Sequence, residues 1–570
     1  MTDTAEPPTG TPPAGTRRGA SAVFAGILLS RASGVVRLSL LRSQLGLGVA
    51  ADAFAAAMRI PNLMQNLLGE GVLSASFIPV YSKMLADEDE DSGKVAGTVA
   101  SLLVAATGVL VAVAVVFAEP LTKVLAFGFP TETFDLTVQL VRIVAVGTGL
   151  LVLSAWCLGV LNSHRHFFLP YVAPVLWNAV QIIVLVFVGL RSWSAQDTAE
   201  AVAWAVVIGS AAQLVIQLPA VLAVEPRLRR GLRKLWAPRH PQVRSVVTRF
   251  GPAVIGRGVV QLSAYIDQFL ASFLAVGAVS ALVTAQILYL LPVSLFAMSV
   301  AAAELPEMSR QQQHLRGIAV RLSVGLERVW FYTGLVTVLY LFAGDLIVAT
   351  LFQRSSFGSD ATLLVTLVLG AYTLGMVAVS GSRLLQNALF SQGDVVTAAK
   401  LATVRVVVAT ALGVVLMLQL EQVFVYDGRL SGWSSSVFPN LEALPSAVRA
   451  NDALPLRAGS VGLGLGAAVG AWVEFALLRS RVAYMLGRRR VAAGRVVPLL
   501  VSAAAATAAV LVVRYLTRGW PVTLRAIAVI VVGSLAYLAV ALSRHVGPAR
   551  ELLDSAARFI RRPRGRSRVG

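Results

Sequence analysis

Apolar runs of about twenty residues recur along nearly the whole of this 570-residue chain. A run of that length is what an α-helix needs to cross the hydrocarbon core of a bilayer. Inside lipid, only helices and closed barrels satisfy all of their backbone hydrogen bonds. Because the sequence is 56% hydrophobic and only 14% charged, we predict an all-α polytopic membrane protein.

The runs predict about fourteen transmembrane helices. The internal repeat described below predicts that they form two homologous lobes around a central cavity. We expect a disordered cytoplasmic tail over residues 1–20, which are rich in Pro, Gly and Thr. The remaining boundaries are an N-terminal lobe over 21–224 (spans 1–6), a C-terminal lobe over 249–420 (spans 7–11), an extracytoplasmic loop over 421–457, spans 12–14 over 458–543, and a basic cytoplasmic tail over 544–570.

The net charge of +20 would fit a nucleic-acid partner, but its distribution argues against one. Lys and Arg lie in short segments between the apolar runs, where they act as orientation signals. With the N-terminus in the cytoplasm, about 30 of them fall in inside segments and about 8 in outside segments. We therefore predict a multi-pass protein of a bacterial cytoplasmic membrane with both termini in the cytoplasm.

The second predicted span carries a polar stripe. Its polar residues recur at three- and four-residue spacing, which places them on one face of a helix: Arg59, Asn62, Asn66, Glu70 and Ser74. Pro61 interrupts the backbone ladder of the same span. A polar stripe on a kinked membrane helix predicts the wall of an aqueous cavity, and a polar seam between packed helices is the alternative.

An internal repeat relates the two halves of the chain. With an offset of 227 residues, Pro79 falls on Pro306, Arg59 on Gln286 and Ile60 on Ile287. Two homologous bundles in parallel orientation, with a substrate path between them, are a recurring transporter design. In these paired spans the first repeat holds most of the charge, so we expect the two lobes to differ in function.

Several segments resemble the MurJ (MviN) family of lipid II flippases, within the multidrug, oligosaccharidyl-lipid and polysaccharide exporter superfamily. They are SRASGVVR, ADAF, RIPNLMQNLLGEG and SFIPVYSK near the start, then GVLNSHRHFFLPYVAPVLWN, GPAVIGRGVVQLSAYIDQFLASFL and LFQRSSFGSDAT. The resemblance covers about residues 21–420 and thins after the tenth span. It implies a fold of fourteen helices in two lobes.

The resemblance also implies a substrate-binding cavity. It places Arg31 and Arg37 where the family has cationic groups facing the cavity, and it matches Asp52 and Glu70 to family positions. Guanidinium groups bind phosphate oxygens in a bidentate manner. The residues predicted to bind substrate are Arg31, Arg37, Asp52, Arg59, Asn66, Glu70, Arg257 and Gln261.

The sequence departs from the family at several positions. Gln65 and Ile287 stand where the family has arginines, and Arg257 is an extra cation in span seven. Arg257 has two equally weighted interpretations. It either restores a cation in the cavity, or its side chain extends to the inner membrane–water interface. Asp267 is a candidate for a cation site, although span eleven lacks most of the matching polar groups. We expect no other metal site.

The expected function is alternating-access translocation of lipid II, with membrane lipid around the protein and cell-wall synthesis proteins as further partners. No Walker loop is present, so we expect no bound cofactor and a membrane potential or monovalent cation gradient as the driving force. The alternatives are an exporter of another polyprenyl-linked glycan or anionic lipid, and a non-transporting paralogue acting as a cell-wall scaffold. We expect no enzymatic activity, because the five His are scattered without ligand spacing.

Overall fold

The computed structural model describes residues 14–231, 235–311, 314–432, 443–487 and 496–560. It divides into two compact units, Met1–Phe269 and Leu270–Gly570, which are described separately below. Of the predicted N-terminal tail, residues 1–13 lie outside the described part, and helix α1 begins at Ala14. Residues 561–570 of the predicted basic tail and residues 433–442 of the predicted loop also lie outside it.

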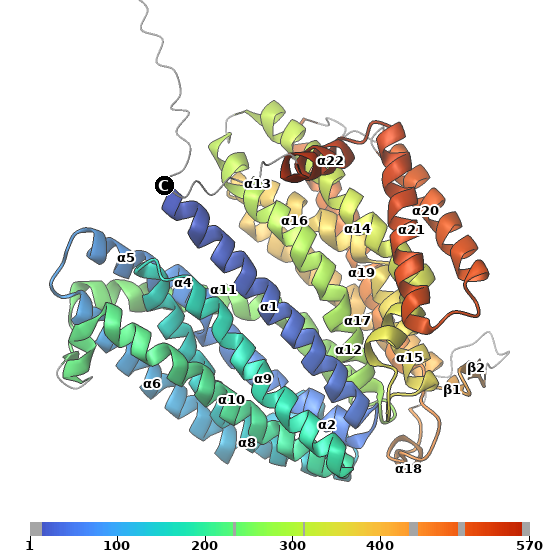
Figure 1. The fold of residues 1–570 in the computed structure, drawn as a ribbon, viewed down its shortest axis with the longest axis horizontal. Coiled ribbons are helices and arrows are strands. Elements are labelled where there is room, and N and C mark those ends of the chain that lie inside the picture. Colours follow the sequence, from blue (N-terminus) through green and yellow to red (C-terminus); the bar gives the residue numbers. More distant parts are fainter. Residues whose placement is uncertain (1–13, 232–234, 312–313, 433–442, 488–495, 561–570) are drawn as a thin grey trace, which may run out of the picture. The chain divides into compact units, whose positions relative to one another are not determined.

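Unit 1 is built of helices (Figure 1). In chain order they are α1 (Ala14–Leu45), α2 (Val49–Ala57), α3 (Arg59–Leu68), α4 (Glu70–Ser76), α5 (Ile78–Ala86), α6 (Ser92–Val116), α7 (Ala118–Ala126), α8 (Thr131–Ser163), α9 (Phe168–Arg191), α10 (Ala195–Val224), the 3₁₀ turn η1 (Pro226–Arg230) and α11 (Pro241–Ala271). Helix α10 packs along both α8 and α9, and α9 packs along α1.

Unit 2 contains the remaining helices and a two-stranded hairpin. They are α12 (Ala278–Pro292), the π-helical turn η3 (Val293–Met298), α13 (Ser299–Arg310), α14 (Leu315–Phe352), α15 (Ser359–Thr373), α16 (Met376–Ser391), α17 (Val395–Leu420), β1 (Phe424–Tyr426), β2 (Arg429–Ser431), α18 (Ser446–Arg449), α19 (Gly459–Met485), α20 (Val496–Leu516), α21 (Val522–Ser543) and α22 (Gly547–Ile560). Helices α20 and α21 form a hairpin that packs against α14.

The prediction of an all-α polytopic membrane protein is confirmed. Within the described residues, eleven helical segments are long and apolar enough to cross a membrane. Many of their apolar side chains point away from the protein; Val116 is 70% exposed and Leu190 is 80% exposed. Such side chains are stable where lipid covers them. The other three predicted spans are α1, the broken segment α2–α5, and α11, which all carry charged residues.

The second predicted span is interrupted three times, at Met58, Gly69 and Phe77. Pro61 is the third residue of α3, just after the first interruption. The largest departure from helix is at Gly69, whose backbone is extended. A Cβ at Gly69 would overlap the carbonyl oxygen of Gln65, so only glycine fits there. Sequence analysis predicted the break at Pro61 and missed the one at Gly69.

The matching span of the second repeat is irregular at the same place. Its π-helical turn, Val293–Met298, falls on positions 66–71 when the offset of 227 residues is applied. Short π-helical turns and extended breaks both release backbone groups from the regular ladder, and they concentrate at functional sites. The second span of each repeat therefore departs from a regular α-helix at the equivalent position.

The loop after α17 is anchored by a buried carboxylate. Glu421 is 2% exposed, and its Oε1 accepts a hydrogen bond from the backbone N–H of Ala275 at 2.5 Å. The side chain of Arg457 donates to the backbone oxygen of Glu421 at 3.0 Å. Strands β1 and β2 follow, joined by Asp427 and Gly428 with positive φ, the combination that tight antiparallel hairpins require.

Candidate functional site

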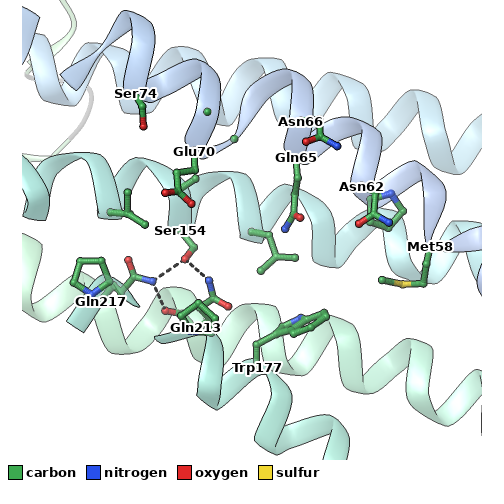
Figure 2. A pocket seen from close by; sticks show the side chains of 18 residues that line it. Met58, Asn62, Gln65, Asn66, Glu70, Ser74, Ser154, Trp177, Gln213 and Gln217 are labelled. Carbon is green, nitrogen blue, oxygen red and sulfur yellow. Dashed lines mark hydrogen bonds between the residues drawn. The ribbon is translucent and has the colours of Figure 1, made fainter. Parts of the chain in front are cut away.

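A cavity of about 600 Å³ lies within unit 1, between the broken second span and helices α8, α9 and α10 (Figure 2). One wall carries the polar stripe predicted from the sequence, and the opposite wall carries groups from the other three helices. The polar lining residues are Asn62, Gln65, Asn66, Glu70, Ser74, Ser154, Gln213 and Gln217, with Trp177 among the apolar ones. Most of this polarity comes from neutral amides and hydroxyls, and Glu70 supplies a carboxylate.

A hydrogen-bonded cluster organises the α8–α10 wall. The hydroxyl of Ser154 accepts from Nε2 of Gln213 at 2.9 Å and from Nε2 of Gln217 at 2.7 Å. The same nitrogen of Gln217 also donates to the backbone oxygen of Gln213 at 3.1 Å. In Figure 2, Glu70 extends toward this cluster from the facing wall. Among the described residues, Oε1 of Gln217 is buried without a hydrogen-bond partner, so it can accept from a ligand or from water.

Arg37 lies behind the cavity wall. Its guanidinium carbon is 4.9 Å from the ring centroid of Trp177, a cation–π contact, and its Nη1 donates to Oε1 of Gln181 at 3.3 Å. Trp177 lines the cavity, whereas Arg37 is not among the described lining residues. Within the described part of the chain, Nε of Arg37 and Nε1 of Trp177 are both buried without a hydrogen-bond partner. These donors are available to an anion if the indole moves.

A second arginine, Arg42, lies five residues further along α1 and is more deeply buried than Arg37. Arg42 is 3% exposed and interacts electrostatically with Asp52, which is 2% exposed. Because each of these buried groups lies beside a group of opposite charge, neither charge is left uncompensated. Asp52 therefore lies near Arg42 of α1, and it is not among the described residues that line the cavity. Arg31, by contrast, is exposed on α1.

The remaining predicted residues lie on α3 and α11. Arg59 does not line the cavity, and its Nε donates to Oε1 of Gln268 in α11 at 2.6 Å. The side chains of Arg257 and Gln261 lie outside the described residues, although their backbone belongs to α11. Asp267 is half-buried on the same helix. In the part of the chain that the structure describes, no group of three or more His, Cys, Asp or Glu side chains is arranged to hold a metal ion.

The structure thus brings Asn66 and Glu70 into one cavity and holds Arg37 behind its wall. Sequence analysis missed the opposite wall, although Gln213 and Gln217 carry the same signal as the predicted stripe, four-residue spacing within an apolar span. It also missed three charged residues inside spans of unit 2, Arg383, Arg405 and Glu474. The general rule that ionisable groups in spans are functional would have found them.

Comparison with known proteins identifies the family. The family model described as "Lipid II flippase MurJ" matches residues 41–438. This chain belongs to the MurJ family. It is 31% identical over 406 residues to a lipid II flippase MurJ of Burkholderia cenocepacia, covering 70% of this chain and 76% of that one. It is also 31% identical to a probable lipid II flippase MurJ of Rhizobium tropici, covering 72% and 77%.

Solved structures support the fold assigned to this MurJ-family chain. An inward closed conformation of lipid II flippase MurJ matches with a TM-score of 0.68 at 20% identity, covering 94% of this chain and 100% of that one. An inward-facing multidrug resistance MATE family transporter matches with a TM-score of 0.60 at 13% identity, covering 82% and 99%. The chain therefore shares its fold with both of these transporters.

Proposed function

We propose that this protein translocates lipid II across the cytoplasmic membrane. The observation that carries the proposal is the polar cavity of unit 1 in a chain of the MurJ family. Lipid II presents a pyrophosphate, two sugars and a peptide, all rich in hydrogen-bonding groups. The amides of Gln65, Gln213 and Gln217 offer both donors and acceptors to such a headgroup. The polyprenyl tail stays in the membrane throughout.

Arg37 supplies the cation for the pyrophosphate in this proposal. Its guanidinium is stacked on Trp177 and keeps one donor unpaired among the described residues. A desolvated guanidinium binds phosphate oxygens strongly, because charge-assisted hydrogen bonds are about twice as strong as neutral ones. Translocation follows alternating access, driven by the membrane potential or by a monovalent cation gradient. No bound cofactor and no catalytic step are needed, and cell-wall synthesis proteins are the partners expected.

The orientation in the membrane is part of the proposal. With both termini in the cytoplasm, Ser446 faces outside and Thr248 faces inside; both side chains are exposed. The native cysteine, Cys157, is fully buried and will not compete for reagent. A membrane-impermeant maleimide applied to intact cells should label Ser446→Cys and spare Thr248→Cys. Labelling of Thr248→Cys alone would reverse the orientation.

A second candidate is an exporter of another polyprenyl-linked glycan or anionic lipid. One observation favours it: Gln65, which lines the cavity, replaces an arginine that the family resemblance led us to expect. A scaffold without transport is the third candidate, and complementation separates all three. Expression in a bacterium depleted of its own lipid II flippase should restore growth. Growth failure with normal membrane insertion would reject lipid II as the substrate, and a flipping assay with other polyprenyl-linked glycans would then separate an exporter from a scaffold.

A further inference from the structure

Three charged side chains meet inside the helical bundle of unit 2. Glu474 of α19 is 1% exposed, and its Oε2 lies 3.3 Å from Nη1 of Arg405 of α17. Its other oxygen accepts from Nε2 of Gln386 of α16 at 2.9 Å. Arg383, three residues before Gln386, lies within electrostatic range of both Glu474 and Arg405. Nothing in the proposed function uses this cluster.

A stripe of glycines fixes the ion pair in place. Gly462, Gly466 and Gly470 follow one another at four-residue spacing along α19, and Glu474 is the next position on the same face. A Cβ at Gly466 would lie 2.6 Å from the backbone oxygen of Ala409, and one at Gly470 would lie 2.8 Å from that of Arg405. Small residues at this spacing let membrane helices approach backbone to backbone. Arg405 is therefore held against Glu474 by close packing.

The cluster carries more positive than negative charge. Two guanidinium groups face one carboxylate, and both oxygens of that carboxylate already accept hydrogen bonds from Arg405 and Gln386. Among the described residues, Arg383 makes no hydrogen bond or ion pair, although its side chain is only partly exposed. An uncompensated cation within a membrane span costs several kcal/mol and is retained where it meets a ligand or a second charge.

Counted along the chain, the helices of this cluster and those of the unit 1 cavity wall have the same order within their bundles. The α8–α10 wall comes from the fourth, fifth and sixth spans of the first bundle, through Ser154, Trp177 and Gln213. Counted from residue 249, the fourth, fifth and sixth spans of the second bundle are α15–α16, α17 and α19. These are the helices that carry Arg383, Arg405 and Glu474. In the matching spans, the polar residues that line the unit 1 cavity are neutral, whereas the cluster of unit 2 is charged.

We propose that Arg383 and Arg405 form a second anion site, in unit 2, that binds the pyrophosphate of a polyprenyl lipid. This inference rests on the proposed function and adds a second binding position for the same substrate. Glu474 holds Arg405, and an arriving pyrophosphate competes with that carboxylate for the guanidinium. Tyr289 lies within electrostatic range of Arg383. It is 8% exposed, and its ring is tilted against that of Tyr372 with 5.5 Å between the centroids.

Binding of undecaprenyl pyrophosphate to the full-length protein in nanodiscs tests this site. Arg383→Gln should weaken binding about tenfold, which corresponds to about 1.4 kcal/mol. Glu474→Gln should tighten binding, because the amide no longer competes with the ligand as a charge. Arg321→Gln is the matched control, since Arg321 of the same unit already pairs with Glu304 and Glu307, and it should bind as the wild type does.

The Glu474→Gln arm separates ligand binding from a purely structural ion pair. If the cluster only stabilises the packing of the helices, Glu474→Gln will lower the unfolding temperature. Its affinity for undecaprenyl pyrophosphate will then be unchanged or weaker. Arg405→Gln combined with Glu474→Gln keeps a neutral hydrogen-bonded pair, so it should remain folded while losing affinity. Equal binding by Arg383→Gln and Arg321→Gln would overturn the inference.

A competition experiment shows whether the site binds the polyprenyl lipid or free pyrophosphate. Inorganic pyrophosphate should displace the lipid from the wild type only at much higher concentration if the polyprenyl chain contributes to binding. Displacement at equal concentration would mean that the site takes free pyrophosphate, and the lipid part of the inference would fall. Failure of the wild type to bind the lipid at all would instead reject the proposed function. Loss in Arg37→Gln without loss in Arg383→Gln would reject this inference alone.

Discussion

The polar cavity of unit 1 and the charged cluster of unit 2 use opposite chemistry on equivalent spans. The cavity is open, about 600 Å³ in volume, and lined mainly by amides and hydroxyls. In the cluster, Glu474 is almost fully buried and is bonded to side chains of α16 and α17. Neutral amides can meet a sugar or peptide in many orientations, whereas guanidinium groups select an anion.

The contrast shows how two homologous bundles can bind different parts of one substrate. In unit 1 the cation, Arg37, is set behind an indole, so that the space beyond it remains available to a large headgroup. In unit 2 the cations are held by packing, and little space is needed for a compact phosphate group. The charge asymmetry predicted for the paired early spans does not extend to the later spans, because unit 2 carries Arg383, Arg405 and Glu474 there.

Replacement of Arg37 should have the largest effect. Arg37→Ala removes the cation that stacks on Trp177 and should slow lipid II translocation in proteoliposomes by more than about tenfold. Arg37→Lys should recover only part of the rate, because an ammonium lacks the planar face that stacks on Trp177. Arg142→Ala, an exposed position on α8, is the control and should be close to wild type. Normal rates for Arg37→Ala would remove this residue from the site.

Disruption of the glycine stripe should have the second-largest effect, a loss of stability. Gly466→Leu forces α17 away from α19, because a Cβ alone would already lie 2.6 Å from the backbone of α17. We expect a loss of about 1–3 kcal/mol, typical of overpacking, measured as a lower unfolding temperature in detergent. Gly108→Leu is matched in type, because nothing lies within 4 Å of its Cβ position, and it should be neutral. Equal effects would show that the α17–α19 contact is not tight.

Adding a cation to the neutral cavity would sharpen the comparison. Gln65→Arg places a guanidinium in the unit 1 cavity, where Glu70 on the same wall can compensate it. Affinity for undecaprenyl pyrophosphate should rise by several fold, with Gln65→Met as the size-matched neutral control. An unchanged affinity would mean that the pyrophosphate does not reach this wall.

The smallest effect concerns pH and the loop anchor of unit 2. Burial raises the pKa of Glu421 to about 7, above its ordinary value of 4.5. The folded state therefore binds the proton more tightly, and stability should fall as pH rises from about 4.5 to about 7. Glu421→Gln should show a smaller change in unfolding temperature between pH 5 and pH 8 than the wild type does. A parallel pH response in both proteins would contradict the assignment.

Much of the fold was predictable because span length and hydropathy are local properties. The stripe from Arg59 to Ser74 was found by periodicity, and its members other than Arg59 line a cavity. The opposite wall was not found, because its groups come from three helices that are distant in sequence. The break at Gly69 depends on the approach of Gln65's carbonyl oxygen, which hydropathy does not reveal. The position of Arg37 behind Trp177 likewise depends on packing of α1 against α9.

Photo-crosslinking from the cavity wall tests the central claim most directly. A benzophenone amino acid at Gln213, inside the cavity, should crosslink radiolabelled lipid II in membranes. The same group at Val109, which is 63% exposed on the outer surface of α6, should crosslink only bulk lipid. Excess unlabelled lipid II should suppress the first product and not the second. Crosslinking of lipid II from Val109 and none from Gln213 would show that the headgroup does not enter the unit 1 cavity.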